Sequence, residues 1–325
     1  MSDTSPRPRR AVRRDSWTRG PGSASARLAR GIAVPQTRTS FRLSPEARVF
    51  HIGDDFARIL AASQRAQGAQ VASLPGPGSP AEFAEPGGAA LLDLPGPEQI
   101  RQELEWAAGT RRFAEEALVP VADDWMDPFL GPAAATGPLA MIRGRRRALA
   151  AHFSRALRTD LVVVTLSRTE TWYDKRTRLA INDAPDARAR RADPERFAMR
   201  RLTYDEVLPV VKAICTLLRR QRDELKIVLA VSPIPVPRTW TGEDVIVANM
   251  AAKSALHAAA TTIASANEGV DYFPAYETFM TADPEIAWES DRRTPRPKAL
   301  ATAARALMDA YGLHLAAGSR TLGTA

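Results

Sequence analysis

Two adjacent aspartates follow a short apolar run and a glycine. In HIGDDFARIL (51–60), Gly53 precedes Asp54 and Asp55, and a helical pattern begins at the next residue. A sharp turn from a strand into a helix is where many α/β enzymes place a nucleophile. A carboxylate there could act as a base, a nucleophile or a metal ligand. We therefore take Asp54 as a candidate catalytic residue.

The same two aspartates could serve the helix instead of a reaction. Aspartates at a helix start accept backbone N–H bonds and complement the helix dipole, and neither role requires catalysis. A polar contact to a ligand is a third possibility. The pattern leaves all three interpretations of Asp54 and Asp55 open.

Four short apolar runs predict the strands that position these residues. They are rich in β-branched residues and run continuously rather than alternating, which is typical of strands buried on both faces of a parallel sheet. The runs are RVFHI (48–52), LVVVTL (161–166), KIVLAVS (226–232) and VDYF (270–273).

Helical patterns lie between and after the predicted strands. They cover residues 99–118, 143–158, 204–222, 245–265 and 297–311. Strands that alternate with helices predict an α/β fold, a three-layer α/β/α sandwich around a parallel sheet. In such a fold ligands bind at the carboxyl ends of the strands.

The composition divides the chain into a folded domain and two ends. Residues 1–45 predict a disordered arginine-rich arm, 46–312 the α/β domain, and 313–325 a C-terminal tail. Within the domain, residues 72–98 are dense in proline and glycine and predict a long surface loop.

The net charge of +8 comes from the first part of the chain. Residues 1–48 contain eleven arginines and three acidic residues, so 11 − 3 = +8, and the remaining 34 basic and 34 acidic residues cancel. The folded body therefore has no net charge to attract a phosphate backbone. Nucleic acid or an anionic surface is a plausible partner for the arm alone.

Other simple classes are excluded by the sequence. No run approaches about 18 apolar residues, so we expect no transmembrane segment. No apolar export region follows Arg9 and Arg10, so we expect a cytoplasmic protein. The single cysteine, Cys215, lies in an apolar run and predicts a buried core residue. The four histidines show no metal-ligand spacing, and we expect neither a metal nor a cofactor.

Six segments, in order along the chain, resemble the GSCFA family, a branch of the SGNH (GDSL-like) hydrolase superfamily. The family motifs G-S-C-F-A, W-x-D-P-F, T-L-G with T-E-x-W, L-T-V-S-P-V, S-K-S-x-L-R and Y-F-P-x-Y-E each have a counterpart. The counterparts are SFRLSPEARVFHIGDDFARIL (40–60), WMDPFLGP (125–132), LVVVTLSRTETWYD (161–174), KIVLAVSPIPV (226–236), AAKSALHAAA (251–260) and DYFPAYETFM (271–280).

The resemblance implies acyl transfer, often on glycans, and this chain departs from it at three places. Acyl transfer needs a serine at the first strand end, backbone donors for the oxyanion and a histidine base. Asp54 and Asp55 stand where the family has serine and cysteine. Ser167 stands where it has a glycine that helps to line the oxyanion hole. Thr294 stands where the superfamily has the histidine of Asp-x-x-His, which begins at Asp291.

Electrostatics makes the first departure the most serious. An ionised carboxylate about 4 Å from a forming oxyanion repels it by roughly 4 kcal/mol at an effective dielectric constant of about 20. This corresponds to a roughly thousandfold lower rate. We therefore do not expect ordinary serine-esterase chemistry at Asp54.

Further candidate ligand-binding residues lie next to Asp54 or beyond predicted strand ends. For Ser167 a plain loop role competes with binding, and for the aromatic and glutamate residues the alternative is packing. Trp106, Trp125, Asp127 and Phe129 could hold a sugar face or support the scaffold, and helix packing is favoured for Lys253 and Ser254. The candidate binding residues are Asp55, Ser167, Glu170, Trp172, Ser232, Tyr276, Glu277 and Thr294.

The sequence therefore predicts a protein of acyl-ester hydrolase or acyltransferase ancestry without serine-histidine machinery. We expect it to bind a small-molecule or glycan-like ligand, acylated or not, or a partner protein. One alternative is an active enzyme that uses Asp54, with Asp291, as base, nucleophile or metal ligand. A second alternative is contact with nucleic acid or an anionic surface through the arm.

Overall fold

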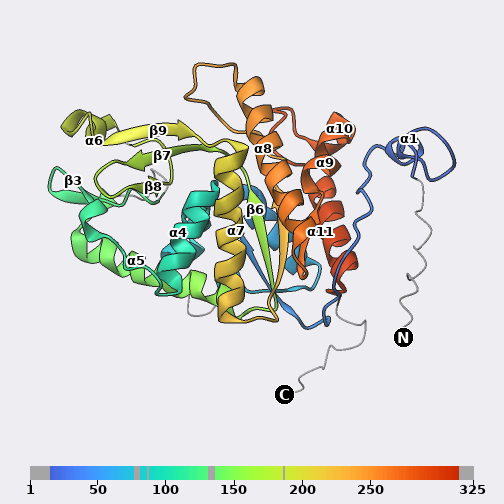
Figure 1. Ribbon diagram of the computed structural model, residues 1–325, viewed down its shortest axis with the longest axis horizontal. Coiled ribbons are helices and arrows are strands. Elements are labelled where there is room, and N and C mark those ends of the chain that lie inside the picture. The colour runs from blue at the N-terminus through green and yellow to red at the C-terminus, as the bar shows by residue number, and fades with distance from the viewer. Residues whose placement is uncertain (1–14, 77–80, 86–87, 131–135, 186, 315–325) are drawn as a thin grey trace, which may run out of the picture.

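A parallel five-stranded sheet lies at the centre of the described part of the protein (Figure 1). The computed structural model describes residues 15–76, 81–85, 88–130, 136–185 and 187–314. The strand order is β11-β10-β6-β1-β2. The strands are β1 (Arg48–Ile52), β2 (Gln70–Val71), β6 (Leu161–Leu166), β10 (Lys226–Val231) and β11 (Val270–Phe273). The four predicted strands are confirmed, whereas the two-residue β2 carries too short a pattern to be predicted.

Helices cover both faces of this sheet, which confirms the predicted three-layer α/β/α sandwich. Successive side chains of β6 point to opposite faces: Val162 and Val164 belong to one apolar cluster and Val163 to the other. The first face is covered by α4 (Pro97–Ala107), α5 (Leu139–Ser154), α7 (Tyr204–Gln221) and α8 (Val245–Ala266). The second is covered by α2 (Asp55–Ala66), α9 (Ala275–Met280) and α11 (Pro297–Tyr311).

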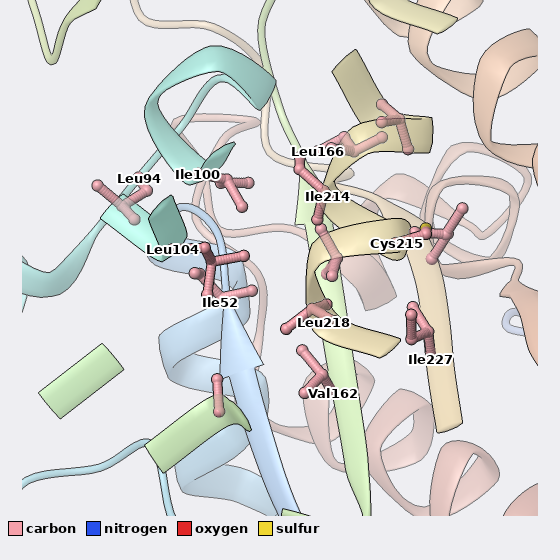
Figure 2. Packing of buried hydrophobic residues seen from close by; sticks show 14 of the residues in the cluster. Ile52, Leu94, Ile100, Leu104, Val162, Leu166, Ile214, Cys215, Leu218 and Ile227 are labelled. Atoms are coloured by element: carbon pink, nitrogen blue, oxygen red, sulfur yellow. The ribbon is translucent and has the colours of Figure 1, made fainter. Parts of the chain in front are cut away.

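The larger core lies between the first face and helices α4 and α7 (Figure 2). Cys215 belongs to this cluster, as the sequence predicted, and burial raises the pKa of its thiol to about 12. Side chains from strands and helices meet here: Ile52, Val162, Leu166 and Ile227 from the sheet, with Ile100, Leu104, Ile214 and Leu218 from α4 and α7.

Two small antiparallel sheets extend the sandwich on one side (Figure 1). One is formed by β3 (Val119–Val121), β4 (Asp124–Met126) and β5 (Thr136–Gly137), the other by β7 (Glu170–Asp174), β8 (Leu179–Ile181) and β9 (Phe197–Arg201). β3, β4, β5 and β8 have only two or three residues, too few for an alternating pattern, whereas β7 and β9 have five residues each and were missed. The remaining elements are short helices: α1 (Ala24–Leu28), α3 (Ala81–Ala84), η1 (Gly88–Leu92), η2 (Glu115–Ala117), η4 (Arg155–Arg158), α6 (Ala187–Ala192) and α10 (Pro284–Ala287).

The N-terminal arm differs from the expectation of disorder wherever the structure describes it. From residue 15 the segment forms α1 and then an extended stretch whose apolar side chains pack against the second core. Phe41 stacks on Tyr311 with ring centroids 4.9 Å apart, and the amide of Ser40 donates to Asp271. These apolar residues are too sparse for a periodic signal but numerous enough to dock. Residues 1–14 of the arm and 315–325 of the predicted tail lie outside the described residues.

The proline- and glycine-rich stretch 72–98 is also more ordered than a surface loop. Its described residues include α3, η1 and the start of α4. Phe83, Leu92 and Leu94 are buried in the first core. The segment therefore closes over one end of the sheet.

The strand order creates a crevice beside β1. From β1 the chain moves outward to the edge strand β2 and then returns to β6 on the opposite side of β1. Connections that leave adjacent strands in opposite directions separate at the strands' carboxyl ends, and ligands of open α/β sheets bind there. The crevice lies directly above Asp54.

A further observation concerns membranes. No helix in the described ranges has both the length and the apolar character needed to cross a lipid bilayer.

Gly53 lets β1 turn into α2, and its replacement is expected to be costly. Its φ is +151°, and an added Cβ would lie 2.4 Å from the backbone oxygen of Thr165. Gly53→Ala is expected to lower the free energy of unfolding by about 2–4 kcal/mol, from backbone strain and overpacking together. Urea denaturation measures this.

Gly68→Ala is the matched control for this prediction. Gly68 also has a positive φ, +98°, but an added Cβ would meet no atom within 4 Å. Its replacement should cost only the backbone strain, about 1 kcal/mol. Equal losses in the two variants would show that the contact with β6 is not what requires a glycine at position 53.

Candidate functional site

A pocket of about 240 Å³ lies at the carboxyl ends of β1, β6 and β10. Asp54 and Asp55 follow β1, Ser167 and Arg168 follow β6, and residues 234–237 follow β10. The lining is completed by residues from the 88–95 stretch, from the end of β8 and from the segment before α11: Ala90, Asp93, Pro95, Asn182, Asp183 and Arg293. The sequence predicted a site at the carboxyl ends of the parallel strands, and the pocket lies there.

Asp54 is turned into the pocket and does not cap the helix. It occupies the N-cap position of α2, yet its side chain accepts no capping hydrogen bond. The side chain is 5 % exposed, and its Oδ1 has no partner among the described atoms. The helix-cap interpretation therefore fails for Asp54, whereas Asp55 Oδ1 accepts the amide of Phe56 at 3.1 Å.

The surroundings of Asp54 favour its protonated form more than water does. Burial raises its pKa to about 6, and repulsion from Asp55 adds to the shift. The charge of Lys253 and the hydroxyls of Ser232 and Ser167 act in the opposite direction. The carboxyl group therefore changes its charge close to neutral pH.

Lys253 is a site residue that the sequence did not identify. It projects from α8 and is fully buried, and Nζ donates to the backbone oxygen of Ser167 at 2.8 Å. The Ser167 hydroxyl lies 3.5 Å from the same nitrogen. Burial lowers the pKa of Lys253 to about 8, and the negative charges of Asp54 and Asp55 limit the shift. The one sequence feature that could have identified it is a charged residue on an alanine-rich helix, but its position in the helical pattern is equally compatible with helix packing.

Asp93 is a second functional candidate that sequence reasoning missed. It lies in the 72–98 stretch and lines the pocket, while Arg58 of α2 donates to it from Nε at 3.0 Å. Burial raises the pKa of Asp93 to about 7, against the opposing effect of Arg58. The long sequence separation of Arg58 and Asp93 hides this pair from local patterns.

The charges that line the pocket are arranged in pairs. Arg293 lies 3.4 Å from Asp55, and Arg168 lies 3.6 Å from Asp183. Together with the pairing of Asp93 and the nearby charge of Lys253, this compensates the acidic groups. The pocket is thus strongly polar without a large net charge.

Two backbone donors next to Ser167 are already occupied. The amides of Ser167 and Arg168 both donate to the carbonyl oxygen of Pro95, at 3.2 and 3.1 Å. The N–H at position 167 is the one that would help to line an oxyanion hole in the family pattern. In this chain it therefore faces a protein carbonyl and not an incoming substrate oxygen.

No imidazole lines the described pocket. His51 is buried on β1 and shares a hydrogen bond with a glutamine of α2, and burial lowers its pKa to about 4. His257 of α8 lies 2.9 Å from Glu277. His152 packs in the first core against Phe50, and His314 contacts Asp309 on α11.

Asp291 and Thr294 do not reach Asp54. Both are exposed, and the carboxylate of Asp291 accepts the hydroxyl of Thr294 at 2.6 Å and the amides of Arg293 and Thr294. These hydrogen bonds lower the pKa of Asp291 to about 2. The structure therefore gives no support to a pair of Asp54 and Asp291, and Arg293 is the residue of this segment that enters the pocket.

Three other predicted residues border the pocket. Ser232 is fully buried behind Asp54, and its hydroxyl acts on that carboxyl group as a hydrogen-bond donor that lowers its pKa. Glu170 and Trp172 on β7 line a neighbouring hollow. Glu170 accepts the Thr239 hydroxyl at 2.5 Å and the Trp240 amide at 2.7 Å, so it holds the 237–244 loop in place.

Tyr276 and Glu277 lie outside this pocket. Glu277 accepts the hydroxyl of Tyr272 at 2.9 Å and pairs with His257, while the hydroxyl of Tyr276 points to Met250. The structure thus joins α9 to α8 through these residues and does not bring them to Asp54.

The predicted acid-and-aromatic set serves a different purpose. Trp106 and Phe129, with Phe113, surround the guanidinium group of Arg146 at ring-centroid distances of 5.2–5.7 Å. Asp127 accepts a hydrogen bond from Arg146. This arrangement favours the scaffold interpretation of these residues.

The described residues contain no group of three or more histidine, cysteine or acidic side chains placed to hold a metal ion. The arrangement at the pocket can instead exchange a proton at Asp54 and accept or donate several hydrogen bonds. Its chemistry is that of a polar pocket with two carboxyl groups, those of Asp54 and Asp93, whose pKa values are raised toward neutral pH.

Comparisons with known proteins place the chain in one family. The GSCFA family model matches residues 48–306. A search of curated proteins gave no match. Among solved structures, a carbohydrate esterase family 3 protein from Talaromyces cellulolyticus is 10 % identical, with 80 % of this chain and 94 % of that chain covered, at a TM-score of 0.33. That similarity is too low to support a conclusion, but the family match covers most of the chain, and the protein belongs to the GSCFA family.

Proposed function

We propose that this protein binds a hydroxyl-rich, glycan-like or acylated ligand above Asp54 and has lost serine-histidine acyl transfer. Its ancestry would be that of the SGNH-type hydrolases and acyltransferases. The observation that carries the proposal is the buried carboxyl group of Asp54 at the end of β1. An acyl hydrolase needs a nucleophile and stabilised negative charge there, and an ionised Asp54 opposes that charge.

Two further features support the loss of this chemistry. The amides of Ser167 and Arg168 are engaged by Pro95, so these donors cannot also stabilise an oxyanion. The pocket lining in the described residues offers no histidine to act as base. Each feature removes a different component of the reaction.

The lining of the pocket supports a neutral, hydroxyl-rich ligand. Three of its four acidic groups, those of Asp55, Asp93 and Asp183, are paired with arginines, so a strongly charged ligand would have to break existing ion pairs. Asp54 Oδ1 and Asn182 Oδ1 are buried acceptors without a described partner. Buried polar groups are normally hydrogen-bonded, and sugar hydroxyls are suitable donors for both.

A second candidate function is acid–base catalysis by Asp54. The raised pKa of about 6 favours it, because a group that titrates near neutral pH can both accept and donate a proton. In that case Asp54 would act without Asp291, whose carboxylate is held by Thr294.

Substitution of Asp54 tests both candidates. The full chain is incubated with p-nitrophenyl acetate, and binding of O-acetylated xylotetraose and of β-1,4-linked N-acetylglucosamine tetramer is measured by calorimetry. We expect no ester hydrolysis above the buffer rate. We expect Asp54→Ala to weaken binding at least tenfold, because a ligand hydroxyl loses a buried acceptor. Asp223→Ala, at an exposed residue before β10, is the control and should leave binding unchanged.

The binding proposal also predicts how ligand affinity changes with pH. Ligand hydroxyls donate best to an ionised carboxylate, so affinity should fall as pH decreases through about 6, the pKa of Asp54. Hydrolysis by the native protein that Asp54→Asn abolishes would overturn the binding proposal in favour of catalysis. Absence of binding to both tetrasaccharides, with no hydrolysis, would overturn both candidates.

A further inference from the structure

We propose that the pocket continues into a second subsite at Trp240, which binds the next ring of an oligosaccharide whose first ring lies above Asp54. This inference rests on the proposed function and specifies its ligand as at least two linked sugar rings. It adds Trp240, a residue that neither sequence patterns nor the family match singles out.

The subsite adjoins the central pocket. A neighbouring hollow lies between β7 and the 237–244 loop, and Trp172 and Trp240 form part of its lining. Arg168, Asn182 and Asp183 line both the hollow and the central pocket. The two hollows therefore lie side by side and share part of their lining.

Trp240 is held in place yet remains accessible. Its amide and the neighbouring Thr239 hydroxyl are both bound by Glu170, and its ring meets Trp172 edge to face at 5.6 Å. The guanidinium group of Arg190 lies over the ring at 5.9 Å, and the residue stays 39 % exposed. An indole fixed by its own backbone loses little freedom on binding, which favours affinity.

Three residues that line the neighbouring hollow carry buried polar atoms without a described hydrogen-bond partner. Asn182 is 6 % exposed, and its Oδ1 is buried without a partner among the described atoms. The Nε of Arg168 and the indole Nε1 of Trp172 are also buried and have no hydrogen-bond partner among the described atoms. These three atoms are one acceptor and two donors. A ligand group that both donates and accepts hydrogen bonds, as a hydroxyl group does, could satisfy them.

The size of the hollow indicates which part of a sugar enters it. Its volume is about 20 Å³, close to the space that one water molecule requires. A hydroxyl group fits, whereas a whole ring does not. The ring would lie across Trp240, because the C–H face of a sugar is apolar and its hydroxyls extend from the edge.

Calorimetry with matched probes tests the subsite. Two series are used on the full chain: N-acetylglucosamine with its β-1,4-linked tetramer, and O-acetylated xylose with O-acetylated xylotetraose. We expect a tetramer to bind at least tenfold more tightly than its monomer. Trp240→Ala should remove that advantage and leave monomer affinity unchanged, while Trp240→Phe retains part of it. Trp17→Ala, at a 66 % exposed tryptophan outside both hollows, should change nothing.

The outcomes separate the two proposals. Equal affinities of monomer and tetramer, or a tetramer affinity that Trp240→Ala does not lower, would overturn the subsite while the central pocket stands. A Trp240→Ala variant that weakens monomer and tetramer equally would also overturn it, because the residue would then act on the central pocket. If neither series binds the native protein, the proposed function itself is overturned.

Discussion

Replacing Lys253 by methionine is expected to lower the free energy of unfolding at pH 7 by about 3–5 kcal/mol. Lys253 is fully buried, and its charge lowers the pKa of the buried Asp54. Removing it leaves an ionised carboxylate without that compensation, and the hydrogen bond to the backbone of Ser167 is also lost. Methionine keeps most of the apolar stem, so packing changes little.

The pH dependence distinguishes the loss of charge from the loss of packing. Because the folded-state pKa of Asp54 is raised, the folded protein binds a proton that the unfolded chain has released between about pH 4 and 6. Stability from this group therefore falls as pH rises through that window. Without the charge of Lys253 the pKa of Asp54 rises further, so the pH range over which stability falls extends to higher pH. The variant should be much closer to the native protein at pH 5 than at pH 7.5.

Urea denaturation of three proteins checks this prediction. They are the native protein, Lys253→Met, and the double variant Asp54→Asn with Lys253→Met. The double variant should regain most of the lost stability at pH 7.5, because no buried charge remains. A loss that is independent of pH, or a double variant as unstable as the single one, would show that Lys253 acts through packing alone.

Arg146→Met is expected to have a comparable effect at a distant place, again about 3–5 kcal/mol. The guanidinium group is bound by Glu103 and Asp127, which are 3 % and 0 % exposed, and it lies among Trp106 and other aromatic rings. Burial raises the pKa of Glu103, but the charge of Arg146 opposes that shift. Removing the arginine leaves two buried carboxyl groups without their cation.

Arg143→Met is the matched control on the same helix, α5. Arg143 pairs with Glu115 at 2.7 Å, but both side chains are about half exposed, so water solvates either partner when the other is removed. Thermal and urea denaturation should show a transition nearly unchanged in Arg143→Met. If the two variants lose equal stability, the burial of the Arg146 cluster is not what makes it important.

Local sequence patterns were sufficient for the central sheet. The continuous β-branched runs at 48–52, 161–166 and 270–273 coincide with β1, β6 and β11, because a strand buried on both faces needs apolar residues at every position. The same logic explains the failures. Strands of two or three residues, such as β2 and β8, contain no repeat from which a period can be read.

The candidate site was only half accessible from the sequence. Gly53 and Asp54 follow directly after a strand, so the sheet topology alone places them at the pocket. Asp291 was expected to act with Asp54 because it matches the aspartate of the superfamily's Asp-x-x-His motif, but two backbone amides and Thr294 satisfy its carboxylate locally. Local hydrogen bonds therefore hold the carboxylate of Asp291 and take the place of the expected pairing with Asp54.

The sequence by itself determined the sandwich and placed the carboxyl group of Asp54 directly after its first strand. Only the tertiary structure decided what surrounds that carboxyl group. Lys253 donates a hydrogen bond to the backbone oxygen of Ser167, 86 residues away in the chain. The carbonyl oxygen of Pro95, in a stretch predicted to be a surface loop, accepts the amides of the two residues after β6. Periodicity reports which side of an element is buried, but the partner of a buried polar group depends on how distant elements pack, and no local pattern contains that information.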